Sequence, residues 1–216
     1  MPIYTAVPTT LALSVGANPT WSGAVSAVQT VNAVYAAATP FTVSGFDYVT
    51  ANTETLLLTG FGFAIPADET ITDVTLNLWR MIFDSTLVGP PVPGVRDETF
   101  RMLKANVSVG NNMAGAINWP SSVTQASYTG SPATWGTTLT YADANDSGFG
   151  VALSVKGVRA DTGATHTWAG DFPLYNAPSA YFDMAQIVIT TTENTGAKPM
   201  KDNGANPRVL EGFCIG

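Results

Sequence analysis

The stretch LTGFGFAIPADETITDVTLNLWRM, residues 58–81, joins a glycine-punctuated aromatic segment to an alternating run. In the run, Val74, Leu76 and Leu78 alternate with polar residues. Because the side chains of a β-strand point alternately to opposite faces, this pattern predicts a strand with one face in an apolar core. We interpret the two phenylalanines as core residues at the end of a preceding strand. Their neighbouring glycines would then allow close packing where a Cβ atom would crowd.

The same alternation recurs along the chain, at residues 11–15, 55–60, 149–156 and 181–192. Turn-forming segments such as GPPVPG, TGSP and NDSG separate these runs. Many short alternating segments with such punctuation are typical of sandwiches and barrels of antiparallel strands. The sequence therefore predicts an all-β fold, an antiparallel β-sandwich of jelly-roll-like form.

Residues 23–38, GAVSAVQTVNAVYAAA, do not fit this alternation. Val28, Val31 and Tyr35 fall at near-helical spacing, but the repeated valines lower helix propensity. We predict a mostly irregular, buried segment here, with a short helix as the alternative.

The chain is interpreted as a single domain, residues 1–193, followed by an extended C-terminal arm, residues 194–216. The arm loses the alternation, yet it ends in VLEGFCIG, whose apolar residues would be unusual on a free tail. We therefore expect the arm to bind another subunit, and we expect the proline-rich loop at residues 85–98 to contact a neighbour. The expected partner-binding residues are Pro90, Pro91 and Pro93 in the loop and Val209, Leu210, Phe213 and Ile215 in the arm.

The charge content is low and its balance is acidic. Asp, Glu, Lys and Arg make up only 12% of the residues, and the formal net charge is −7. A surface with so few charges favours contact with other protein, and the scattered basic residues argue against nucleic-acid binding. No secretion signal and no apolar run of membrane-spanning length is present, so we expect neither export by that route nor membrane insertion.

Catalytic chemistry has little support in the sequence. The single histidine, His166, would need Asp161 or Asp171 as an orienting partner in a serine hydrolase, and the chain has no G-x-S-x-G motif. One histidine and one cysteine are too few for a zinc site. The adjacent acidic pairs at residues 68–69 and 97–98 would point to opposite faces of a strand. We expect a protein that is not an enzyme and uses no cofactor.

Two binding alternatives rest on local composition. Asp143, Asn145 and Asp146 are spaced loosely like a calcium loop, but the acidic residue that closes such a loop is absent, and turn capping explains them more simply. Five tryptophans suggest sugar binding, with Trp79 and Trp168 as the candidate platforms. Packing in the core or in an interface is the favoured interpretation of the tryptophans.

Several motifs in order resemble a β-sandwich module of structural proteins in tailed bacteriophages and prophages. They are LLLTGFGFAIPADETITDVTLNLWR, YTGSPATWGTTLTYADANDSGFGVALSV and YFDMAQIVIT, preceded by Trp21-Ser22 and Tyr35-Ala36. The resemblance covers residues 20–192. The chain departs from the module's usual Asp-Gly at Asn32-Ala33, and from its usual glycine at Asp73.

The resemblance implies a virion component, located in the virion after assembly in the host cytoplasm. Together with the low charge and the apolar arm, it favours a capsid decoration (cement) protein whose partners are the major capsid protein or other virion proteins. A homo-oligomer is expected, with a trimer preferred. The alternative is a tail- or fibre-associated module that binds host glycans.

Overall fold

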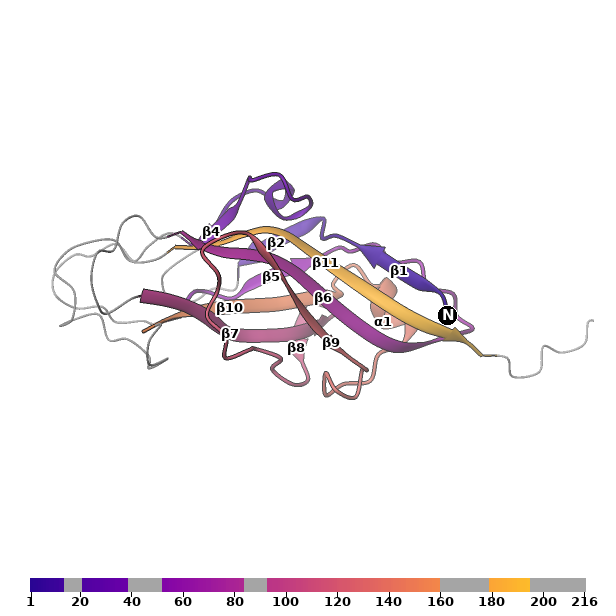
Figure 1. Cartoon of the computed structure of the whole chain (residues 1–216). Helices are drawn as coiled ribbons and strands as arrows, with labels where there is room; N and C mark the ends of the chain where they lie inside the picture. The colour runs from indigo at the N-terminus through magenta and orange to yellow at the C-terminus, as the bar shows by residue number, and fades with distance from the viewer. Residues whose placement is uncertain (14–20, 39–51, 84–92, 160–178, 195–216) are drawn as a thin grey trace, which may run out of the picture.

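A computed structural model describes residues 1–13, 21–38, 52–83, 93–159 and 179–194. In these residues the chain forms two antiparallel sheets that pack face to face as a sandwich (Figure 1). The first sheet contains β1 (Ile3–Ala6), β3 (Trp21–Ser22), β4 (Ala36–Ala38), β6 (Glu69–Phe83), β9 (Thr124–Gly130) and β11 (Ser179–Glu193). The second sheet contains β2 (Thr10–Leu13), β5 (Leu56–Thr59), β7 (Pro93–Lys104), β8 (Val107–Val109) and β10 (Gly150–Arg159).

The strand order is that of a jelly roll. The eight strands from β4 to β11 are arranged as β4-β11-β6-β9 in one sheet and β5-β10-β7-β8 in the other. Counted from one to eight, these orders read 1-8-3-6 and 2-7-4-5, so the chain repeatedly crosses between the sheets, as in a doubled Greek key. The predicted all-β sandwich is therefore confirmed.

The predicted alternation fills the core. Val74, Leu76 and Leu78 of β6 are buried, and they lie in one apolar cluster with Ile187 and Ile189 of β11. Three irregularities reset the alternation where it would otherwise fail. Strand β11 gains an extra residue at position 183 opposite β6, β6 gains one at position 72 opposite β11, and β7 gains one at position 98 opposite β10. Such β-bulges re-aim the side chains that follow them.

The two glycines of the GFGF segment differ in their roles. The expected crowding is confirmed at Gly60, where a Cβ atom would clash with Thr9 Oγ1, but not at Gly62. Phe61 and Phe63 are buried as predicted, and their rings stack 6.2 Å apart. Gly60 and Gly62, however, adopt left-handed backbone with φ of +71° and +66°. A Cβ atom on Gly62 would meet nothing within 4 Å, so backbone conformation rather than crowding requires glycine there.

Residues 23–38 fold as a short 3₁₀ helix, η1 (Val25–Val28), an irregular turn and β4. The prediction of a mostly irregular segment with a short helix is confirmed, but the predicted burial is wrong for residues 30–34, where Val31 and Val34 are 52% and 54% exposed. The turn is held by Asp183, whose carboxylate accepts hydrogen bonds from the backbone N–H of Asn32 (3.0 Å) and Ala33 (3.3 Å). The one α-helix described, α1 (Tyr141–Asn145), and η1 are both too short to cross a membrane.

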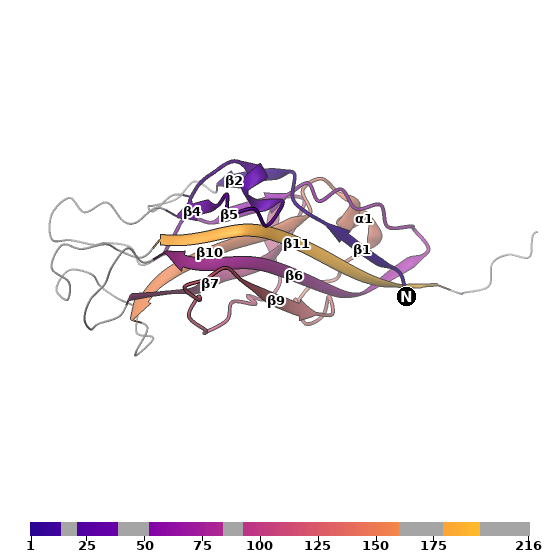
Figure 2. The ribbon, with the colours of Figure 1, turned by 45° about the horizontal axis from the view of Figure 1, so that its top comes forward.

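The two ends of the sandwich differ. Pairing brings the end of β6 beside the start of β11, through Ser179 and Phe83, and the end of β10 beside the start of β7, through Arg159 and Pro93. The N-terminus and the end of β11 lie at the opposite end, as Figures 1 and 2 show. We call the end that holds Phe83, Ser179, Pro93 and Arg159 the connection end.

Replacing Ala33 by glycine is expected to stabilise the fold. Ala33 has φ of +60°, a left-handed conformation that costs an L-residue about 1–2 kcal/mol, whereas glycine adopts it freely. After the entropic penalty of glycine, Ala33→Gly should raise the free energy of unfolding by about 0.5–1 kcal/mol in urea denaturation. The control Ala37→Gly lies in strand β4 and should lower it. Destabilisation by both substitutions would contradict the assigned turn.

Candidate interaction surface

The outer side of the first sheet lacks charged side chains over most of its length. From Thr75 to Met81 in β6, the outward positions pair with outward positions of β9 on one side and β11 on the other. We call these residues the uncharged face. Its members are Thr75, Asn77, Trp79, Met81, Gln125, Ser127, Thr129, Tyr181, Met184, Gln186 and Val188.

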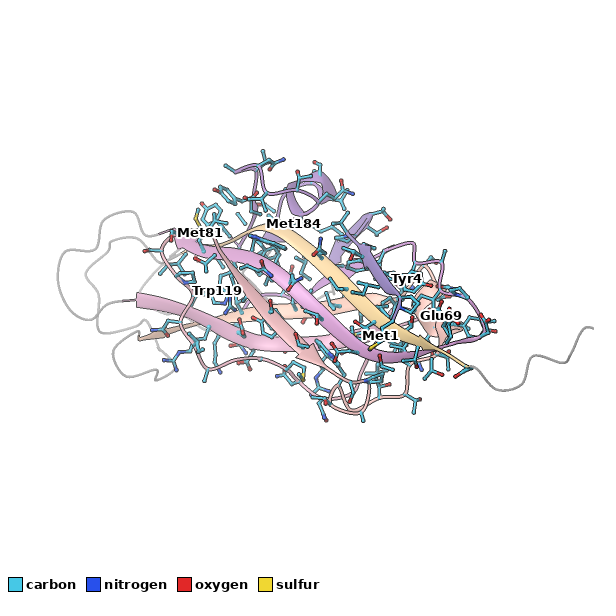
Figure 3. The ribbon with its side chains drawn as sticks, turned by 45° about the vertical axis from the view of Figure 1, so that its right-hand side comes forward. Met1, Tyr4, Glu69, Met81, Trp119 and Met184 are labelled. Atoms are coloured by element: carbon cyan, nitrogen blue, oxygen red, sulfur yellow. The ribbon has the colours of Figure 1, made fainter. Side chains whose placement is uncertain are left out.

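The uncharged face is apolar toward the connection end. Trp79 pairs with Met184 across the strands, and Met81 pairs with Tyr181. The ring of Tyr35 meets that of Tyr181 edge-on at 5.3 Å. All five side chains are half-buried. Figure 3 shows Met81 at the connection end and Met184 farther along the first sheet, with Met1, Tyr4 and Glu69 toward the opposite end.

The remainder of the uncharged face is polar, and its side chains bond to one another. The Asn77 side-chain oxygen accepts hydrogen bonds from Ser127 (2.7 Å) and Gln125 (3.0 Å), and its nitrogen donates to Gln186 (3.3 Å). Thr75 donates to Thr129 (3.0 Å). Because these groups already have hydrogen-bond partners within the face, covering the face would leave fewer polar atoms without partners than covering an ordinary polar surface.

A buried ion pair lies behind the apolar end of this face. Arg80 follows Trp79 and points inward, where its guanidinium donates to the Asp97 carboxylate of β7 in the opposite sheet. Asp97 also accepts from Trp119 Nε1 (2.7 Å), the Tyr128 hydroxyl (2.8 Å) and the Gly115 N–H (2.9 Å). A buried carboxylate with this many donors is fully compensated, so the pair links the two sheets.

The aromatic members of this cluster pack against the guanidinium, whose buried Nε has no hydrogen-bond partner among the described residues. Its carbon lies 5.0 Å from the ring centroid of Trp119 and 5.7 Å from that of Tyr128, which favours the cation. Burial, and then the nearby Asp97 carboxylate, raise the pKa of the Tyr128 hydroxyl far above its usual value. Tyr128 therefore remains a protonated donor, and the cluster is a structural connection rather than an acid–base pair.

A cleft of about 410 Å³ lies on the other side of Asp97. Its lining residues are Arg96, Asp97, Glu98, Asn112, Ala114, Gly115, Ala116 and Lys156. Lys156 is paired with Glu98 at 2.7 Å, and Asp97 is paired with Arg80. Arg96 Nε donates to the side-chain oxygen of Asn118 at 2.6 Å.

The proposed calcium residues are engaged in local structure. Asp143 and Thr140 form a reciprocal capping box at the start of α1, and Asp143 pairs with Lys104 at 3.0 Å. Partial burial opposes ionisation, but the bonds from Thr140 and Lys104 outweigh it and lower the pKa of Asp143. Asn145 exchanges two hydrogen bonds with the Ile65 backbone, and Asp146 accepts from the Gly148 N–H. Turn capping thus accounts for Asp143 and Asp146, whereas Asn145 joins α1 to the distant Ile65 backbone.

Three of the five tryptophans lie in the core, as the favoured interpretation predicts. Trp21, Trp119 and Trp135 are buried, and each indole N–H donates to an acceptor inside the protein. Trp79 faces outward, as its place in the alternation predicts. The glycan candidate Trp168 lies outside the described residues.

The acidic pairs point to opposite faces, as expected. Asp97 is buried while Glu98 reaches Lys156 on the outer side, and Glu69 is buried while Asp68 is exposed. Glu69 accepts hydrogen bonds from Tyr4 and Thr191.

The expected partner-binding residues fall largely outside the structure. Pro90, Pro91, Val209, Leu210, Phe213 and Ile215 lie outside the described residues, as does His166. Pro93 begins β7 and pairs with Arg159. In the parts of the chain that the structure describes, no group of three or more His, Cys, Asp or Glu side chains could hold a metal ion.

Comparison with known proteins does not assign the chain to a family. No protein-family model matches the chain, and no curated protein matches it significantly.

Removing Asp97 is expected to destabilise the protein severely, because Arg80 would remain buried without an opposing charge. Asp97→Ala should lower the free energy of unfolding by about 3–5 kcal/mol in urea denaturation. The neighbouring Glu98 makes a half-exposed pair with Lys156, so Glu98→Ala should cost less than about 1 kcal/mol. Similar losses for the two variants would show that the buried pair does not link the sheets.

Proposed function

We propose that the protein is a structural protein of a bacteriophage virion, most specifically a capsid decoration (cement) protein that binds and stabilises the assembled particle. The proposal rests on protein–protein contact rather than catalysis. Its partners are the major capsid protein or other virion proteins, and its place is the virion. The ordered motifs that resemble phage sandwich modules motivate the viral setting.

The observation that carries the proposal is the uncharged face. It spans β6, β9 and the neighbouring part of β11, it is apolar around Trp79, Met81 and Met184, and its polar groups are bonded internally. Depletion of charge with enrichment in aromatic residues and methionine is the composition of protein interface cores. The jelly-roll order supports the proposal because this architecture recurs in viral capsid proteins, although it also occurs in lectins.

A non-enzymatic role agrees with how the ionisable groups are used. Among the described residues, the two most buried acidic side chains, Asp97 and Asp183, are bonded to groups that hold the fold together. In the cleft beside Asp97, Glu98 and Lys156 are paired with each other. These contacts support an assembly function for the described part of the chain.

Host-glycan binding by a tail- or fibre-associated module is the second candidate, and one observation favours it. Trp79 is half-exposed beside Gln125, so an aromatic face and an amide lie together, as in many sugar sites. A sugar platform requires this indole to stay open in the assembled protein, whereas an interface covers it. The two candidates therefore differ in the accessibility of the face.

Quantitative mass spectrometry of purified virions tests the proposal directly. A decoration protein should be present in many copies, at a fixed ratio to the major capsid protein, because it repeats with the capsid lattice. Particles prepared with and without the gene provide the control. Absence of the chain from purified virions, or its presence in only a few copies per particle, would overturn the decoration role.

A further inference from the structure

We propose that the uncharged face pairs with the same face of a second copy of this chain, around a two-fold axis. This inference rests on the proposed function, because it takes the uncharged face as a surface of protein contact within the assembled particle. The proposed partner on this face is a second copy, and the experiment distinguishes it from the arm of this chain and from a different virion protein.

Charge selects the face on which two identical copies can meet. Each copy has a formal net charge of −7, so contact between charged surfaces places like charges together. Like-charge contacts across an interface cost several kcal/mol. The outer side of the second sheet carries Glu98 and Lys156, and Lys104 and Asp143 lie near α1. The uncharged face avoids this repulsion entirely.

The size of the face bears on the strength of the pair. Strands lie about 4.8 Å apart and rise about 3.4 Å per residue, so the three strands of the face over the eight residues from Tyr181 to Val188 cover about 400 Å². Two copies would bury about 800 Å², which is the size of a weak, reversible contact, so the dimer should form as the protein concentration rises.

The distribution of side chains determines the orientation. When the same face of two copies meets, the contact is isologous and the symmetry is two-fold. An axis parallel to the strands places the apolar end of one copy against the apolar end of the other, with Met184 and Trp79 at the centre of contact. Both connection ends then point in the same direction, so both copies present the same end to a common partner.

Sedimentation velocity of the full chain over a concentration series tests this pairing. The wild-type protein should form a dimer of twice its 22.6 kDa mass. Met184→Lys places two ammonium groups against each other and should give a folded monomer, with Met81→Lys as the second variant if the first fails to fold. The control Ser108→Lys lies exposed on β8, away from the face, and should remain dimeric.

A mixing experiment makes the test specific for two-fold contact. Met184→Lys and Met184→Glu should each be monomeric, and an equimolar mixture should regain the dimer because opposite charges then meet. A monomeric or trimeric wild type would overturn the inference, as would dimers that survive both lysine substitutions on the face.

The two proposals fail separately. A monomer that is abundant in virions would reject the pairing and retain the decoration role. A dimer that is absent from virions would reject the decoration role and retain the pairing.

Discussion

The pairing of β6 with β11 is the constraint on which the rest of the structure depends. The two strands run antiparallel from Ser179 opposite Phe83 to Glu193 opposite Glu69. Because the side chains of a strand alternate strictly, the register that buries Leu76 beside Ile187 also places Asn77 beside Gln186 on the outer side. The core and the uncharged face are therefore two consequences of one register, and a shift by one residue would exchange them.

The same register creates one difficulty, which the second sheet resolves. Continuing the alternation of β6 places Arg80 in the apolar core, where an isolated cation is strongly unfavourable. Asp97, from β7, supplies the opposing charge, and Trp119 and Tyr128 complete the surroundings. The Arg80–Asp97 ion pair thus connects the two sheets directly behind Trp79, at the apolar end of the face.

The sequence predicts what local periodicity determines. The alternation in β6 and β11 identifies their core residues, and the turn-forming segments predict a sandwich of antiparallel strands. Periodicity also places Trp79 outside. It could have placed Arg80 inside, but the general exposure of charged residues argues against that choice unless a partner is known. Asp97 lies on another strand, and its pairing is a long-range contact that no local pattern encodes.

Other features depend on backbone geometry that composition does not reveal. The β-bulge at Asp183 directs its carboxylate toward the turn that contains Ala33. The left-handed conformation of Ala33 could not be predicted from the sequence, because alanine usually avoids this conformation. Gly62 is likewise required by its φ angle and not by a crowded neighbour. The internal bonding of Asn77 with Gln125 and Gln186, which makes the face suitable for contact, depends on strand register.

Methionine oxidation in purified virions tests the central claim, that the uncharged face is covered by protein in the assembled state. Met81 and Met184 lie on the face, whereas Met1 is 82% exposed far from it. After brief peroxide treatment and mass spectrometry, we expect sulfoxide on Met1 with Met81 and Met184 protected, relative to the dilute protein. Equal oxidation of Met81 and Met184 in virions and in the dilute protein would contradict it.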